Sequence, residues 1–274
     1  MYRILPSGTT NPQTPQYADP LSEQQLAMAR RRTLARGETI CEPGLPEVVG
    51  YVVSGVVKLV TFCPDGRTNI IAVIEAPGFF GRVFGISAEF TIEAATDVVL
   101  ACFDRASFEQ QLSRNPALEH VIHIENLHQL DEAQERITVL ACQSMIERMA
   151  MYMVLRLLAA EARSAVPASS TPSIHIPLNR RDFAAYLGTT VETVSRNIQA
   201  LVRRGTIEVI DSANFRLLRR RDLFAIAARD EEDLLEVVRS RARQIPARPT
   251  FLQPPAMPFP LHIEPTAHQM VAAG

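Results

Sequence analysis

The sequence predicts an α+β fold in three successive parts: a β-rich jelly roll, a long helix and a winged helix-turn-helix. Three observations lead to this prediction. Short Val-rich runs separated by Gly and Pro turns fill residues 31–104, heptad-spaced residues follow over 123–141, and a helix, Gly turn, helix and hairpin follow over 179–218. These patterns are typical of short buried strands, of a helix that pairs with another helix, and of a winged helix-turn-helix.

The 274 residues are divided into five predicted segments. Both ends are polar or Pro-rich and lack strand or helix periodicity, so disorder is expected there. The segments are a disordered N-terminus (1–20), a β-roll domain (21–115), a long dimerisation helix (116–143), a winged helix-turn-helix (144–222), and a helical extension with a disordered Pro-rich tail (223–274).

The β-rich part contains clear strand and turn signals. The run "YVVSGVVKLVTF" is broken at Ser54-Gly55, and "FCPDGRTNIIAVI" places Pro64-Asp65-Gly66 between two apolar runs. Such a Gly turn between apolar runs predicts a hairpin, and "DVVLACF" predicts a further buried strand. Several short strands of this kind favour a closed sandwich or jelly roll.

The long helix carries a heptad seam. His123, Leu127, Leu130, Gln134, Ile137 and Ala141 step by four and three residues alternately. This spacing predicts a helix that pairs with its own copy, with Leu127, Leu130, Gln134 and Ile137 as the dimer seam. A core helix within one chain is the alternative, because the seam is short and partly polar. Ser144 and Glu147 then have capping-box spacing and predict a second helix to about Leu158.

The C-terminal unit begins with Asn179, which is expected to cap a helix over residues 180–187 before Gly188 permits a tight turn. Thr189 and Glu192 have capping-box spacing, which predicts a second helix over about Thr190–Arg203. The runs "TIEVI" and "FRLL" around the turn "DSAN" then predict a hairpin wing.

The second helix is strongly amphipathic. Its inward stripe is predicted to hold Val191, Val194, Ile198 and Leu201, and its outward stripe Glu192, Ser195, Arg196, Gln199 and Arg203. In a helix-turn-helix the start of this helix enters the DNA major groove, where Arg reads guanine and Glu accepts from cytosine. Two local alternatives stay open: Glu192 closes a capping box, and Arg196 forms a surface salt bridge.

Charge is unevenly distributed along the chain. The net charge is −2, but residues 178–221 hold nine arginines and four acidic residues, which is 9 − 4 = +5. A basic segment of this kind can contact phosphates, although an ordinary solvated face is the alternative.

The sequence lacks the motifs of several other classes of protein. The sequence shows neither a membrane span nor a secretion signal, and Cys41, Cys63, Cys102 and Cys142 form no CxxC pair. A cytoplasmic protein without disulfides or zinc is therefore expected. A cupin-type barrel enzyme would need His and carboxylate ligands on its strands, but the first histidine is His120. No enzyme motif was found, and no enzyme activity is expected.

The stretch "LNRRDFAAYLGTTVETVSRNIQALVRRGTIEV" resembles the helix-turn-helix of the cAMP receptor protein/FNR (Crp/Fnr) family of bacterial transcription regulators. The core "VETVSR" is similar to the FNR and FixK branches, and a looser resemblance covers the β-roll and the long helix. It implies a homodimeric, cytoplasmic DNA-binding regulator, usually an activator working with RNA polymerase, on a palindromic TTGAT-type site. Glu192, Ser195 and Arg196 would read bases. The residues that would contact the DNA backbone or support the base readers are Arg180, Thr190, Thr193, Gln199 and Arg203.

Members of the family sense signals through a cyclic-nucleotide pocket or an iron–sulfur cluster, and the residues for both are missing here. The family's nucleotide pocket carries a Gly-Glu turn and an Arg-Ser/Thr pair, but here Arg82 follows Gly81 and no such pair follows. A buried phosphate would lack its partner, so no cAMP is expected. No cysteine precedes Cys41, so no iron–sulfur cluster is expected either. Two forms of control stay open: DNA binding without an effector, or gating by an unidentified non-cAMP molecule or a redox signal.

Overall fold

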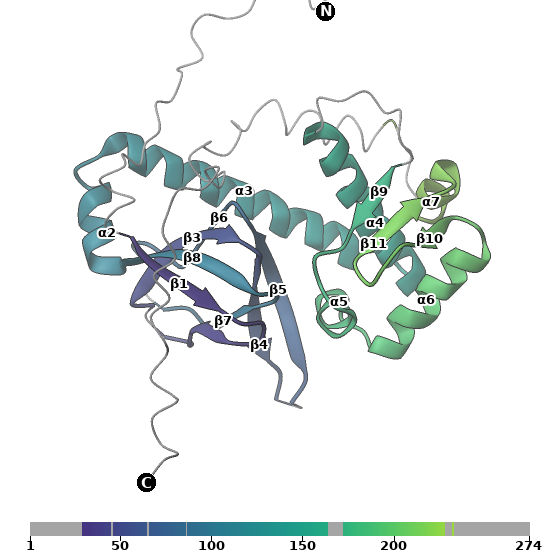
Figure 1. The fold of residues 1–274 in the computed structure, drawn as a ribbon, viewed down its shortest axis with the longest axis horizontal. Helices are drawn as coiled ribbons and strands as arrows, with labels where there is room; N and C mark the ends of the chain where they lie inside the picture. Colours follow the sequence, from purple (N-terminus) through teal and green to yellow (C-terminus); the bar gives the residue numbers. More distant parts are fainter. Residues whose placement is uncertain are drawn as a thin grey trace, which may run out of the picture.

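The computed structural model describes residues 29–163 apart from 45, 65 and 86, residues 172–227, and residue 232. The expected disordered N-terminus and Pro-rich tail lie outside these residues. A β-roll occupies the left of Figure 1 and a winged unit the right, and a long helix runs between them. The fold is α+β, as the sequence predicts.

The β-roll consists of two four-stranded antiparallel sheets. Val52 and Leu100 of one sheet and Val57 and Ile92 of the other are buried in one apolar cluster, so the sheets pack face to face. The first sheet has the order β1 (Arg30–Leu34), β8 (Val98–Asp104), β3 (Val48–Ser54), β6 (Gly78–Phe80), and the second has the order β2 (Thr39–Cys41), β7 (Thr91–Ala94), β4 (Val56–Phe62), β5 (Thr68–Glu75).

Two glycines explain the turns around β4. Gly55 has φ +85°, and a Cβ atom there would lie 2.2 Å from the carbonyl oxygen of Asp97, so only glycine fits between β3 and β4. Gly66 has φ +79° in the turn between β4 and β5, where the amide of Cys63 donates to the carbonyl of Arg67. The predicted hairpin at 64–66 is confirmed.

Two capped helices follow the β-roll. Asp104 caps α2 (Arg105–Leu112), and Asn115 caps α3 (Pro116–Leu140) by accepting from the amide of Leu118. Leu118 and Ile122 of α3 are buried in a cluster with β-roll residues such as Phe79. The first half of α3 therefore belongs to the β-roll core, and its remainder reaches across to the winged unit (Figure 1).

A short joint, residues 141–144, separates α3 from α4 (Met145–Arg163). The predicted capping box is present: the amide of Glu147 donates to Ser144 Oγ at 3.3 Å, and the amide of Ser144 donates to Glu147 Oε2 at 3.3 Å. The helix continues past the predicted Leu158 because Leu157 and Leu158 are buried in the core of the winged unit. No described helix is long and apolar enough to span a membrane.

The winged unit packs α4 against the helix-turn-helix and a small sheet. Its elements are β9 (Ser173–His175), α5 (Arg180–Leu187), α6 (Val191–Arg203), β10 (Ile207–Val209), β11 (Asn214–Leu217) and α7 (Arg220–Ile226). The sheet order is β10-β11-β9, so the predicted hairpin gains a third strand. The sequence analysis missed β9 because its three residues pair with β11 in tertiary contact and show no periodicity of their own.

Candidate nucleic-acid interface

The first helix of the motif, α5, begins and ends as the sequence predicts. Asn179 Oδ1 accepts from the amides of Arg181 and Asp182 at 2.9 and 3.1 Å. Gly188 ends the helix in the left-handed region, at φ +69°. This turn sends the chain directly into α6.

The start of α6 differs from the expected capping box. The expected cap was Thr189 with Glu192, but the capping residue is Thr190, whose Oγ1 accepts from the amide of Thr193 at 3.3 Å. The helix therefore begins at Val191, one residue later than expected. Either threonine satisfies the local pattern, and Thr190 prevails because Thr189 donates its amide to the Ala184 carbonyl in the turn.

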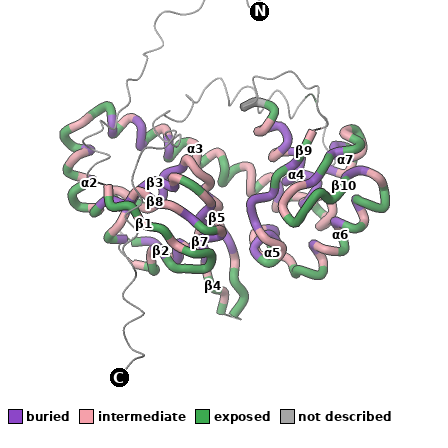
Figure 2. Tube along the Cα trace, in the orientation of Figure 1, coloured by how far each residue is buried: buried purple, intermediate pink, exposed green. Residues whose placement is uncertain are grey.

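The two faces of α6 are clearly separated. Val194, Ile198 and Leu201 are buried in the core of the winged unit, as predicted. Val191 was expected beside them, but it is the first residue of the helix and is 36% exposed. The opposite face is solvent-exposed (Figure 2), with Glu192, Arg196, Gln199 and Arg203 exposed and Ser195 half-buried.

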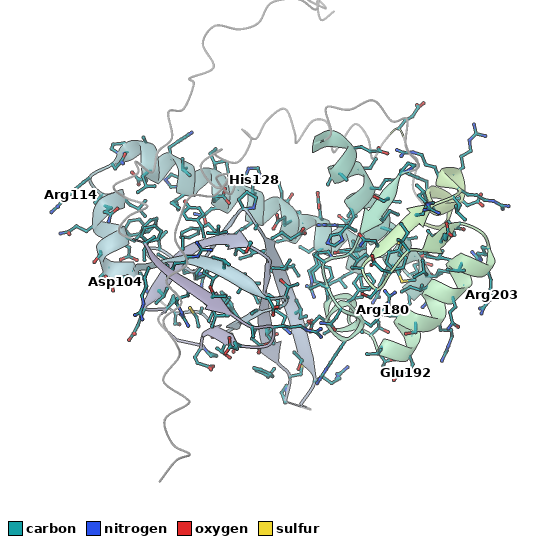
Figure 3. The ribbon with its side chains drawn as sticks, in the orientation of Figure 1. Asp104, Arg114, His128, Arg180, Glu192 and Arg203 are labelled. Carbon is teal, nitrogen blue, oxygen red and sulfur yellow. The ribbon has the colours of Figure 1, made fainter. Side chains whose placement is uncertain are left out.

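Glu192 is held at the start of its own helix. Its backbone amide, the Thr190 hydroxyl and the charge of Arg196 all lower the pKa of its carboxyl group. No ion pair joins Glu192 to Arg196 among the described residues, so Arg196 acts on Glu192 through its charge alone. Glu192 and Arg203 mark the two ends of α6 in Figure 3. The exposed face of α6 thus presents a carboxylate and a guanidinium one turn apart.

Arg180 lies at the first turn of α5 with its guanidinium over the ring of Phe215, 5.1 Å from the centroid. Partial burial lowers the pKa of Arg180. The ring orients the guanidinium, which is suited to a phosphate contact beside the wing. Phe215 was not expected in this role; its only sequence signal was its place in the predicted strand "FRLL".

The positive charge of the basic segment is partly neutralised. Arg216 pairs with Glu208 across the wing at 2.6 Å, Arg219 pairs with Asp222, and Arg220 pairs with Glu161. For Arg180, Arg196 and Arg203 the described residues provide no carboxylate partner within ion-pair distance. These three arginines of the motif remain available for an anionic ligand.

The predicted seam lies on the exposed side of α3. Leu127, Leu130 and Ile137 are 48%, 54% and 66% exposed, and Gln134 is exposed as well. Large apolar side chains normally avoid such exposure on a helix whose other side is already packed. The seam residues therefore form one uncovered apolar stripe in the single chain.

A small hollow of the β-roll adjoins Gly81 and Arg82, the turn at which the family resemblance would put a nucleotide. Its lining includes Cys41, Gly81, Arg82 and Phe90, and its volume of about 10 Å³ has room for a single water molecule. Arg82 Nη1 donates to the Ser87 carbonyl at 3.0 Å, so it closes its own turn. These residues do not fit a cyclic nucleotide, for which a pocket of roughly 300 Å³ or more is typical.

The described residues contain no group of three or more His, Cys, Asp and Glu side chains that could hold a metal ion. Burial raises the pKa of the Cys41 and Cys102 thiols. The four cysteines are free thiols, and none lies next to α6 in sequence.

Comparisons with known proteins agree with this arrangement. A model described as a cyclic nucleotide-binding domain matches residues 31–115, and a Crp-like helix-turn-helix domain matches residues 147–226. A probable transcriptional activator of Rhizobium leguminosarum bv. viciae is 33% identical over 201 residues, which cover 72% of this chain and 81% of that protein.

Two further similar proteins are FixK proteins of Bradyrhizobium species. The nitrogen fixation regulation protein FixK of Bradyrhizobium diazoefficiens is 29% identical over 187 residues, covering 67% of this chain and 76% of FixK. The structure of FixK2 from Bradyrhizobium japonicum superposes with a TM-score of 0.63 at 26% identity, covering 74% of this chain and 98% of FixK2.

Proposed function

Because this chain belongs to the Crp/Fnr family of transcriptional activators, we propose that it acts as a homodimer on a palindromic TTGAT-type promoter site. The observation that carries the proposal is α6, a capped helix with one buried apolar face and one exposed face of base-reading side chains. A dimer would place two such helices in successive major grooves, one helical turn of DNA apart.

Base reading is assigned to Glu192, Ser195 and Arg196. The Arg196 guanidinium is exposed and without a carboxylate partner among the described residues, so its fork is free for guanine O6 and N7. Glu192 is held ionised at the helix start, which suits it to accept from a cytosine amino group. Ser195 stands between them on the same face.

Contacts to the DNA backbone are assigned to residues around this face. Arg180 is oriented by Phe215, and Arg203 is exposed at the far end of α6. Thr190 caps the helix by accepting from the Thr193 amide, and the two hydroxyl groups lie 3.1 Å apart at the helix N-terminus, a favourable position for a phosphate. Gln199 is exposed on α6 between Arg196 and Arg203. It is assigned a supporting contact beside these two arginines.

The homodimer is assigned to the exposed seam of α3. Leu127, Leu130, Gln134 and Ile137 form a stripe on α3 opposite the β-roll core. Pairing with a second copy would cover this stripe and bring the two winged units together. Contact with RNA polymerase, and action in the cytoplasm where the DNA lies, follow from the assigned role as an activator.

Control without a cyclic nucleotide is supported by two features. The hollow in the β-roll has a volume of about 10 Å³, and Arg82 is engaged with Ser87 instead of facing a ligand. We therefore assign DNA binding to the protein without a nucleotide, which is one of the two forms of control that the sequence leaves open.

A gel shift tests the proposal. Aerobically purified protein without added ligand should bind a TTGAT-N4-ATCAA palindrome tightly and a TGTGA-type palindrome weakly, at one stated salt concentration because such affinities depend on salt. Failure on both probes would overturn the effector-free assignment. Repeats with cAMP, and under reducing anaerobic conditions, would then separate a missing effector from a wrong assignment of α6.

A further inference from the structure

The joint at 141–144 divides the chain into two bodies. Leu118 and Ile122 anchor the first half of α3 in the β-roll core. Helix α4 is buried with α5, α6 and the wing in a second apolar cluster, which also takes in Val139 of α3 and Val56 and Ala95 of the β-roll. Without side contacts, the winged unit could turn about these few residues. The orientation of α6 relative to the dimer seam therefore depends on what holds the two bodies together.

A buried ion pair crosses between them. Lys58 on β4 is the only lysine of the chain. Its Nζ lies 2.8 Å from Oδ1 of Asp182 on α5 and 3.3 Å from Oε2 of Glu93 on β7. Lys58 and Asp182 are each only 8% exposed. Asn179, the cap of α5, donates to the other oxygen of Asp182.

Two further polar contacts cross at neighbouring points. Arg156 of α4 forms a two-bond pair with Glu75 of β5, one bond being 3.1 Å, and donates to the His175 carbonyl of β9 at 3.1 Å. Arg136 of α3 donates at 3.3 Å to Asn69 of the β4–β5 hairpin and to the Tyr186 carbonyl of α5. The hairpin and α3 thus contact α4 and α5 at three places.

We propose that Lys58 and Asp182 form an interdomain latch that fixes the orientation of α6 for binding both half-sites of a palindrome. Apolar contacts tolerate sliding, but a buried ion pair with its hydrogen bonds is satisfied in one geometry only. Its separation would leave Lys58 with Glu93 alone and take the ammonium partner from the buried carboxylate of Asp182. Val56 of the β-roll lies in the core cluster of the winged unit beside this contact. This inference rests on the proposed function, because it needs a dimer and a two-part site.

The latch orients the reading face and does not cover it. With the Lys58–Asp182 pair formed, Glu192, Arg196, Gln199 and Arg203 remain exposed on the opposite side of the motif. In Figure 1, α5 lies between β5 and α6, so the latch acts on α6 through α5. Lys58 is therefore a positioning residue. It affects binding only when the two recognition helices of a dimer must match the spacing between two half-sites.

This difference can be measured with two DNA probes. One is the TTGAT-N4-ATCAA palindrome, and the other is a duplex of equal length with a single TTGAT half-site. Binding to a half-site needs one winged unit, whatever its orientation relative to the β-roll. Binding to the palindrome is tighter when the second winged unit is held in the right orientation, because its effective concentration at the second half-site is then high. Lys58→Met should weaken binding to the palindrome about tenfold or more and leave half-site binding within about twofold.

Controls separate the latch from a general loss of folding. Glu161→Gln removes the pair with Arg220 inside the winged unit and should bind both probes as the wild type does. Lys58→Arg keeps the charge and should retain most palindrome binding. Should Lys58→Met fail to fold, Glu75→Gln removes the more exposed Arg156 pair and should show the same selective loss to a smaller extent. Amide hydrogen exchange should also rise in α5 and in the β4–β5 hairpin of Lys58→Met alone.

Equal loss on both probes, or unchanged palindrome binding with unchanged hydrogen exchange, would overturn the latch. A wild-type protein that binds the palindrome no better than the half-site would instead overturn the proposed two-site function, and the latch with it. A selective loss on the palindrome, together with faster exchange in α5, would support the latch.

Discussion

The Oγ1 atom of Thr190 lies 3.3 Å from the backbone nitrogen of Thr193 and accepts its hydrogen bond, so Thr190 is the cap from which the recognition helix begins. Thr190→Ala should lower the free energy of unfolding by about 1 kcal/mol, because a first-turn amide loses its acceptor. Thermal or urea unfolding followed by circular dichroism measures this change. Thr189→Ala is the matched control and should have little effect; the reverse result would place the cap at Thr189.

Local signals in the sequence were sufficient for most of the fold. The Asn179 cap, the Ser144–Glu147 box and the hairpin at Gly66 each depend on residues within a few positions, and the structure contains all three. The predicted start of α6 was wrong by one residue because Thr189 and Thr190 both fit the local pattern. Only the tertiary turn, in which the Thr189 amide bonds Ala184, decides between them.

The long-range contacts could not be predicted from the sequence. Lys58 and Asp182 are 124 residues apart, and neither carries a local pattern that announces an ion pair. Strand β9 likewise exists through its pairing with β11. The exposure of Val191 was missed because helical periodicity places it on the apolar stripe, although it stands at the very start of the helix. The exposed face of α6 was predictable because periodicity alone separates it from the core.

Arg196 is expected to determine base preference. Arg196→Ala should remove roughly 1–3 kcal/mol of discrimination between TTGAT and a half-site with one changed base pair, because the two-bond contact to guanine is lost. Arg196→Lys keeps the charge but not the planar fork, so it should keep affinity better than preference. Competition gel shifts with matched and mismatched probes measure both. An unchanged preference in the Ala variant would remove Arg196 from the base readers.

Arg203 is expected to act through its charge. It is exposed at the end of α6, away from the first turn, to which base reading is assigned. Arg203→Ala should weaken binding to all sequences similarly and reduce the slope of log affinity against log salt by about 1. Arg114→Ala, on the opposite side of the molecule in Figure 3, is the control and should leave the slope unchanged. A change of base preference without a change of slope would contradict the phosphate role.

Glu147 should contribute to acid sensitivity at the joint. Hydrogen bonds from the Ser144 hydroxyl, the Ser144 amide and the Gln143 amide hold the pKa of its carboxyl group below the ordinary value of 4.5. A lowered folded-state pKa means that stability is present above the unfolded-state value and is lost as pH falls through the folded-state value. Thermal unfolding measured from about pH 7 down to about pH 3 should show this loss, and Glu147→Gln should show a smaller one.

Ile137 tests the dimer seam. It is 66% exposed in the single chain, so a substitution there disturbs pairing more than the fold of the subunit. Ile137→Asp would place two like charges face to face in an apolar seam, and the dimer should dissociate. Analytical ultracentrifugation measures the mass directly, and the palindrome should lose its advantage over the half-site in the same variant.

Asn126→Asp is the matched control, since it adds the same charge to an exposed position of α3 outside the four seam residues. It should remain dimeric and bind the palindrome. If Ile137→Asp also remained dimeric, the exposed stripe on α3 would not be the interface, and the recognition helices would have to be joined through another surface. If both variants became monomeric, charge on α3 in general would be responsible, and the seam assignment would lose its support.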